Sequence, residues 1–363
     1  MSDNPNLFAQ QEANRRRSRW LVVGFILFFA WLGFGGDYIY YLWTRDAPPA
    51  AYHHVFPAFG LLLSGIAAVI AAYAWATGPR KVLWATGARE LITPDTPQER
   101  QLENVVEEMA IAAGIQKPRI WIVPDPDPNA FATGRDERTA SIAVTQGLLD
   151  LCSRDELQGV IAHEMGHIKN LDVRLMTLLA ALVGAVALIS DGLSRVMFRS
   201  GGRGVRVSGG GGGRGGGGGG SRDRGNGGGG GPLLLLLLAL WIISWLLAPL
   251  ITRLLALGVS RDREYLADAM SAQFTRNPMS LATALEKIEH AAAPTKSIKG
   301  GTAHLCIADP LGRRLNTHEG KLAELFGTHP PMALRVARLR AMAYQEMKRA
   351  GELVPPQPEG AAG

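Results

Sequence analysis

The pentapeptide His163-Glu164-Met165-Gly166-His167 has the residue types and the spacing of a zinc-hydrolase site. Two histidines four residues apart lie on one face of a helix, so both imidazoles can bind the same metal ion. Glu164 lies beside them and can accept a proton from water while that water attacks a polarised carbonyl. The motif therefore predicts zinc bound by His163 and His167, with Glu164 as general base in peptide-bond hydrolysis.

A helix start precedes this motif. Ser153-Arg154-Asp155-Glu156 has the form of a capping box, with Ser153 as N-cap and Glu156 reaching back to it. A helix that begins there carries both histidines in its interior. This context favours the zinc interpretation over the alternative, a chance match on an ordinary amphipathic helix.

A catalytic zinc ion needs a third protein ligand and an open fourth position. The metzincin spacing would place a glycine and a third histidine where the chain has Asn170 and Val173, so that solution is excluded. Glu264 and Asp268 lie one helical turn apart further along the chain. Glu264 could bind the metal while Asp268 accepts a hydrogen bond from the outer nitrogen of a ligand histidine. From the residues alone, solvated carboxylates paired with neighbouring arginines remain the alternative.

Several motifs in order resemble the HtpX family of membrane-bound zinc metallopeptidases, over roughly residues 15 to 342. They are the helix with His163 and His167, Arg263-Glu264-Tyr265-Leu266-Ala267-Asp268, Asn277-Pro278 and Thr328-His329-Pro330-Pro331. The resemblance implies one zinc ion per chain, bound by His163, His167 and Glu264. It also implies that Glu164 is the catalytic carboxylate and that Asp268 supports a ligand. Implied substrates are polypeptides, namely misfolded or damaged membrane proteins in envelope quality control.

The distribution of apolar residues predicts an integral membrane protein. Of the 363 residues, 47% are hydrophobic and 19% are charged. Trp20 to Gly36 has no charge, and Val55 to Ala76 is 22 residues without one. Both stretches can cross about 30 Å of hydrocarbon, so we predict two transmembrane helices. A cleaved signal peptide competes for the first, but no small-residue cleavage site follows it and a second span comes next.

Basic residues predict the orientation of these spans. Four arginines between positions 15 and 19 precede the first span, and Arg80 and Lys81 follow the second. The connecting loop has only Arg45, opposed by Asp46. Both ends are therefore expected in the cytoplasm. We predict a multi-pass protein of the bacterial inner membrane with its active site facing the cytoplasm, and we expect Cys152 and Cys306 to be reduced thiols.

Two later apolar segments leave the topology open. Leu175 to Ser190 has 16 uncharged residues, which is short for a span, whereas Leu233 to Thr252 is long enough. Resemblance to the family favours two full spans, and a hydrophobic hairpin is the alternative. Between them, Ser200 to Gly231 contains 20 glycines and five arginines, which departs from the family pattern. We interpret it as a flexible linker, with contact to anionic lipid or nucleic acid as alternatives; nucleic acid is not an expected partner.

The remaining sequence predicts an α+β, mainly helical fold: a zincin-type metallopeptidase domain with integral-membrane helices. Thr96 to Gly114 has helical periodicity, and Arg119 to Val123 and Thr139 to Thr145 read as strands. The segment between the strands predicts either an exposed strand edge that holds substrate or a simple turn. Asn277-Pro278 is expected to start a helix, and His329 is either structural or an oxyanion-stabilising residue.

These features divide the chain into eight predicted segments and leave three functional alternatives. The alternatives are a processing peptidase for lipidated carboxyl-terminal peptides, a non-catalytic zinc-binding membrane scaffold, and a membrane-tethered nucleic-acid binder. The segments are a basic cytoplasmic N-terminus (1–19), two transmembrane helices with a short periplasmic loop (20–76), the first part of the peptidase domain (77–174), a third hydrophobic segment (175–198), the Gly/Arg-rich loop (199–231), a fourth hydrophobic segment (232–257), the second part of the peptidase domain (258–350) and a disordered tail (351–363).

Overall fold

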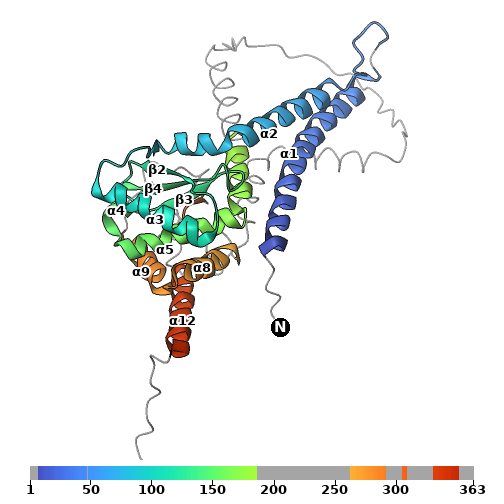
Figure 1. Ribbon diagram of the computed structural model, residues 1–363. Helices are drawn as coiled ribbons and strands as arrows, with labels where there is room; N and C mark the ends of the chain where they lie inside the picture. The colour runs from blue at the N-terminus through green and yellow to red at the C-terminus, as the bar shows by residue number, and fades with distance from the viewer. Residues whose placement is uncertain (1–6, 47, 186–261, 292–304, 309–329, 351–363) are drawn as a thin grey trace, which may run out of the picture. The chain divides into compact units, whose positions relative to one another are not determined.

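The structure is a computed structural model that describes residues 7–46, 48–185, 262–291, 305–308 and 330–350. The chain divides into two compact units, of which the first comprises residues 1–26, 67–184 and 252–363. Among the described residues, helices predominate around one small sheet, which confirms the α+β, mainly helical class (Figure 1). The expectations for the Gly/Arg-rich loop, the fourth hydrophobic segment, His329 and the C-terminal tail fall outside the described residues.

The first unit contains a four-stranded sheet in the order β1-β2-β4-β3. Its strands are β1 (Arg89–Glu90), β2 (Arg119–Val123), β3 (Ala130–Thr133) and β4 (Ser141–Thr145). β2 and β4 are parallel, with Arg119 opposite Ser141, whereas β1 and β3 run antiparallel to their neighbours. β2 matches its predicted bounds, and β4 begins two residues later than predicted because a turn closed by Asp136 and Thr139 precedes it.

Helix α5 (Arg154–Lys169) is the central helix of this unit, and Figure 1 shows it between the sheet and helices α8 and α9. It packs on α3 (Pro97–Ala113), α8 (Asp262–Thr275), α9 (Pro278–His290) and the edge strand β3. Gly159 permits the close approach of α9, because a Cβ there would lie 2.6 Å from the Leu281 amide nitrogen. A single buried core spans α3, α5, α9, the sheet and α12 (Met332–Ala350).

The helix starts follow the expected local signals. Ser153 and Glu156 form the predicted capping box of α5, and Thr96 and Glu99 form another on α3. Thr145 caps the short helix α4 (Gln146–Leu151). Pro278 begins α9 as predicted, but the side chain of Asn277 makes no capping hydrogen bond.

The predicted strand edge is present, but it is buried rather than exposed. β3 lies at the edge of the sheet, and all four of its residues are buried. Phe131 forms an antiparallel bridge with Cys306, and the Ile307 amide donates a 2.9 Å hydrogen bond to the Ala130 carbonyl. The described residues 305–308 thus cover part of this edge, which a local sequence pattern could not reveal.

Helices α1 (Leu7–Thr44) and α2 (Ala58–Ala85) are long and apolar enough to cross a membrane. Only 17% and 22% of their most apolar windows are buried, which distinguishes them from the core helices of a soluble protein. Both helices continue past the predicted spans, α1 before Trp20 and α2 beyond Ala76. These helices supply the hydrophobic surface expected of membrane spans.

In the second unit, a buried carboxylate joins α1 to the start of α2. Asp37 accepts hydrogen bonds from the Phe59 amide at 3.1 Å and the Gly60 amide at 2.6 Å, and it lies 2.7 Å from the His54 ring. Free amides at the beginning of a helix favour a negative charge. This explains why an aspartate follows the uncharged stretch of the first predicted span.

The third hydrophobic segment starts almost directly after α5. Leu171 has a φ of 59°, a left-handed conformation that is uncommon for leucine and that ends the helix. Residues 172–185 are again helical. Leu178 and Leu182 pack with Ala71 and Ala74 of α2, and partly buried side chains of α1 border this cluster. The helix formed by residues 172–185 thus begins directly after the two-residue turn that follows α5.

Candidate active site

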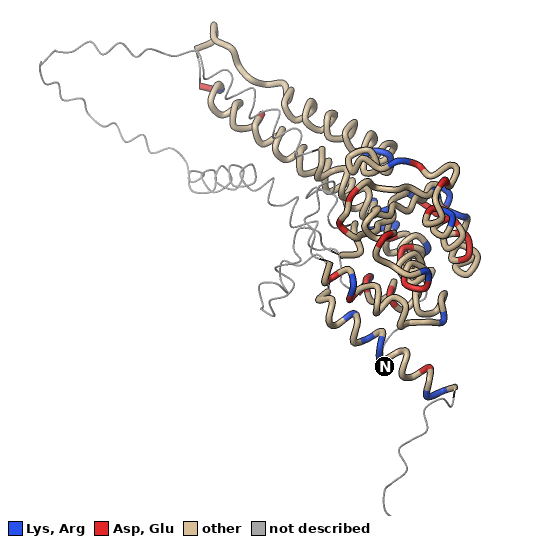
Figure 2. Tube along the Cα trace, turned by 90° about the vertical axis from the view of Figure 1, so that its left-hand side faces the viewer, with Lys and Arg blue, Asp and Glu red and all other residues tan. Residues whose placement is uncertain are grey.

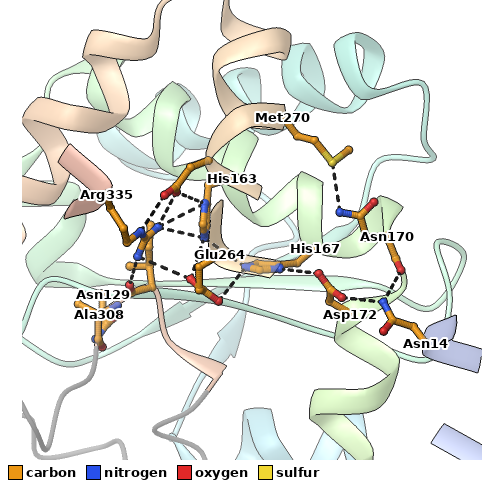
Figure 3. Close-up of polar contacts among 12 residues, drawn as sticks. Asn14, Asn129, His163, His167, Asn170, Asp172, Glu264, Met270, Ala308 and Arg335 are labelled. Atoms are coloured by element: carbon orange, nitrogen blue, oxygen red, sulfur yellow. Dashed lines mark hydrogen bonds and ion pairs between the residues drawn. The ribbon is translucent and has the colours of Figure 1, made fainter. Parts of the chain in front are cut away.

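Helix α5 presents His163 and His167 on one face, as the motif predicts. The Nε2 atoms of the two rings lie 3.2 Å apart (Figure 3). The side chain of His163 is fully buried, whereas that of His167 is 13% exposed. The pair is therefore enclosed by protein on the His163 side and open on the His167 side.

The first turn of α8 brings Glu264 to both histidines. Its Oε2 lies 3.6 Å from Nε2 of His163, and its Oε1 lies 3.6 Å from Nε2 of His167. The structure thus gathers the three residues predicted as metal ligands, with one donor atom of each within 4.8 Å of the others. Tetrahedral zinc with bonds of about 2.0–2.2 Å separates neighbouring donors by about 3.3–3.6 Å. The separations and the N/O donor set fit zinc.

A carboxylate holds the outer nitrogen of each histidine. Nδ1 of His163 lies 2.9 Å from Asp268, which confirms the contact expected for that aspartate. Nδ1 of His167 lies 3.0 Å from Asp172. Such contacts favour the tautomer with a proton on Nδ1 and leave Nε2 free to bind a metal.

The acidic neighbours also shape the charge of the site. Burial alone lowers the pKa of His163, but hydrogen bonds to Asp268 and Glu264 outweigh it and raise that pKa to about 9. Burial opposes charge on Asp268, yet Arg335 and His163 lower the pKa of this aspartate. The carboxylates of Asp268, Glu264 and Asp172 thus surround the two imidazoles, and the guanidinium of Arg335 lies 3.4 Å from Nε2 of His163 as their counter-charge.

Asp172 was not predicted from the sequence, and its position depends on the first helix. The side-chain amide of Asn14 donates to Asp172 at 2.7 Å and to the Asn170 carbonyl at 2.9 Å (Figure 3). Gln11 donates to the Lys169 carbonyl at 2.7 Å. A chain of hydrogen bonds therefore runs from buried Asn14 on α1 through Asp172 to His167.

We expect Asp172→Ala to lower zinc affinity by roughly 10- to 100-fold, because removal of an outer-shell partner leaves the tautomer and orientation of His167 unfixed. Asn14→Ala should lower it less, since Asp172 remains. Zinc titration against a competing chelator measures both effects. Ser18→Ala is the control, because Ser18 is buried on the same helix and, among the described residues, its hydroxyl bonds only to the Asn14 carbonyl. Equal affinities in all variants would contradict a role for this hydrogen-bond chain.

Arg335 is a second residue that sequence reasoning missed. It is fully buried on α12 and binds both oxygens of Asp268, with Nε at 2.9 Å and Nη2 at 2.7 Å. Its Nη1 donates to the Ile307 carbonyl at 2.9 Å and lies 3.6 Å from Glu264. This bidentate contact fixes the Asp268 carboxylate against His163, and it also anchors the segment that pairs with β3.

Glu164 is buried beside the histidines and is not neutralised by a close partner. Neither carboxylate oxygen has a hydrogen-bond partner among the described residues. Burial raises the pKa of Glu164, while the nearby His163 and His167 lower it in part. A buried carboxylate with a raised pKa and free lone pairs is suited to accept and return a proton.

A small cavity adjoins these groups. Glu164, His167 and Glu264 line it together with Asp172, and its volume is about 20 Å³. That volume is sufficient for one water molecule. The arrangement thus places a candidate proton acceptor and two candidate metal ligands around space for one water molecule. His329, the remaining candidate, lies outside the described residues.

A His-Glu-x-x-His helix joined by a glutamate from a later helix, in a chain with two membrane-compatible helices, defines the class of membrane-associated metallopeptidases. The family model described as "Peptidase family M48" matches residues 96–343. This chain therefore belongs to peptidase family M48. The match includes both histidines, Glu164 and Glu264, and it makes the chain a metal-dependent peptidase whose substrates contain peptide bonds.

Curated relatives extend the similarity into the membrane helices. "Protease HtpX homolog" of Streptococcus gordonii is 36% identical over 337 residues, covering 93% of this chain and all of that protein. The protein of the same description from Thermoanaerobacter pseudethanolicus is 40% identical over 250 residues, 69% of this chain and 74% of its own length. The resemblance to the HtpX family is confirmed. Among solved structures, S. mikatae Ste24p aligns with 92% of this chain and 66% of its own, at 16% identity and a TM-score of 0.39.

Proposed function

We propose that this protein is a zinc-dependent endopeptidase that cleaves misfolded or damaged membrane proteins. His163, His167 and Glu264 would hold one zinc ion per chain. The observation that carries the proposal is the buried carboxylate of Glu164, with both oxygens free of hydrogen bonds among the described residues, beside three converging metal-binding side chains. Zinc bound there would polarise the scissile carbonyl and lower the pKa of water.

Glu164 is the group that moves the proton. Its carboxylate takes a proton from the attacking water and later delivers it to the nitrogen of the leaving amine. Its buried position strengthens its basicity, because an apolar environment opposes the charged form. Asp268 and Asp172 orient His163 and His167 through their Nδ1 atoms, and Arg335 keeps Asp268 in place. These three side chains position the two histidines.

We further propose a location in the bacterial inner membrane, with the active site facing the cytoplasm and the peptidase domain in two parts, residues 77–174 and 258–350. The arginines before α1's apolar stretch and the basic residues near the end of α2 support this orientation. The apolar helical residues 172–185 follow α5 within two residues, which keeps the metal-binding helix close to the predicted membrane surface. That proximity supports membrane proteins as substrates.

Casein hydrolysis by the detergent-purified full chain tests this proposal. We expect chelation to abolish cleavage and added zinc to restore it, with one zinc ion bound per chain by metal analysis. Casein is a suitable probe because it lacks a stable fold and leaves its backbone accessible. Stoichiometric zinc binding without cleavage of casein or any other unfolded protein would instead support the non-catalytic scaffold.

A further inference from the structure

Arginines from two elements line one open cavity in the first unit. Arg15 and Arg19 lie one turn apart on α1, and Arg174 belongs to the helical residues 172–185. The cavity has a volume of about 690 Å³. Figure 2 shows very few charged residues along the apolar stretches of the two long helices α1 and α2. The other residues that line the cavity are Phe8, Gln11 and Glu12.

The three guanidinium groups are not neutralised within the described part of the chain. None of Arg15, Arg19 and Arg174 forms an ion pair or a side-chain hydrogen bond with another described residue, and Nε of Arg174 is buried without a partner there. Glu12 at the cavity wall and Asp136 near Arg174 supply the nearby negative charge. Three positive charges thus face one space with little compensation.

The positive charges also repel one another. Burial is the largest cause that lowers the pKa of Arg174. The charges of Arg15 and Arg19 lower this pKa further, whereas Asp136 raises it. The guanidinium of Arg174 is held 4.5 Å above the ring of Trp75 on α2, so it does not simply move away into solvent. An anion in the cavity would relieve this repulsion.

The position of the cavity indicates which anion it meets. Arg15 and Arg19 directly precede the uncharged stretch that begins at Trp20, and Trp75 lies at the end of the uncharged stretch of α2. All of these residues therefore lie at the same predicted membrane surface. Phosphate groups of lipid headgroups occur there at high density, and guanidinium forks bind phosphate oxygens in pairs. Basic pockets between membrane helices on the cytoplasmic side are typical headgroup sites.

We propose that Arg15, Arg19 and Arg174 bind a phosphate group, carried by the headgroup of an anionic phospholipid. The bound phosphate joins the start of α1 to the turn after α5. Asn14 adjoins Arg15, and Asp172 lies two residues before Arg174, so the headgroup stabilises the region in which Asn14 holds Asp172 against His167. The site thereby makes the geometry of a metal-binding histidine sensitive to the surrounding lipid.

Native mass spectrometry of the full chain tests the site without requiring peptidase activity. The protein is equilibrated with an equal mixture of phosphatidylglycerol and phosphatidylcholine in detergent, and retained lipids are counted. We expect the wild type to retain phosphatidylglycerol preferentially. The triple variant Arg15→Gln, Arg19→Gln, Arg174→Gln should lose this preference by about tenfold or more, because each arginine near an anionic headgroup contributes to its binding.

A variant with the same loss of charge is the matched control. Arg16→Gln, Arg17→Gln and Arg138→Gln remove three exposed arginines that do not line the cavity, and this variant should retain phosphatidylglycerol. The single variant Arg15→Gln, at an exposed position, should reduce the preference without affecting folding. Equal losses in the triple and control variants, or no headgroup preference in the wild type, would overturn a lipid site. Binding of inorganic phosphate without any headgroup preference would identify free phosphate as the ligand.

Discussion

The variant Glu164→Gln is expected to bind zinc as the wild type does but to lose peptide hydrolysis. Glutamine keeps the size of the side chain in a fully enclosed position, so the packing of α5 should be preserved. It cannot accept the proton of the attacking water, and loss of general-base catalysis lowers rates by about 10²- to 10⁴-fold. Metal analysis and casein hydrolysis on the same preparation measure both properties.

A charge-matched variant on the same helix controls for this experiment. Asp155→Asn changes an exposed carboxylate in the first turn of α5, remote from the cavity, and should retain normal hydrolysis. The chemical argument depends on the free lone pairs of Glu164, since a carboxylate already bonded to donors would be a weaker base. Full activity of Glu164→Gln, in a preparation free of other proteases, would remove Glu164 from the mechanism.

Sequence predicted the parts of the fold that local signals determine. The capping box at Ser153 and Glu156, the bounds of β2 and the start of α9 at Pro278 each depend on a few consecutive residues. The spacing of His163 and His167 fixed their common helix face for the same reason. Helix periodicity and caps therefore sufficed to orient one half of the candidate site.

Contacts between distant segments could not be predicted in this way. Asn14 reaches Asp172 across 158 positions, and Arg335 reaches Asp268 across 67. No local pattern distinguishes either residue from the other polar side chains of an amphipathic helix. For Asp172, the sequence does show that a carboxylate follows His167 by five residues. The contact between them also depends on the left-handed conformation of Leu171, which that spacing does not predict. Residues 305–308, which cover part of the β3 edge, follow that strand by more than 170 positions.

The variant Glu264→Ala is expected to lose stoichiometric zinc together with hydrolysis. Two histidines alone leave the metal with too few protein ligands for a stable catalytic site. We do not expect Asp268 to replace Glu264, because in the wild type both of its oxygens bind Arg335 and one also contacts His163. Metal analysis after dialysis against a weak chelator measures the loss, with Glu264→Gln as a variant that preserves side-chain volume.

The neighbouring variant Asp262→Ala separates loss of the ligand from a general effect on α8. Asp262 is exposed in the same first turn, so its removal should leave zinc content unchanged. Comparing the thermal unfolding of metal-free Glu264→Ala with that of metal-free wild type shows whether the site itself remains folded. If folded Glu264→Ala still holds one zinc ion per chain, the third ligand must be another residue, with Asp268 and His329 as the candidates. If Glu264→Ala loses zinc while Asp262→Ala keeps it, α5 and α8 together form the metal site.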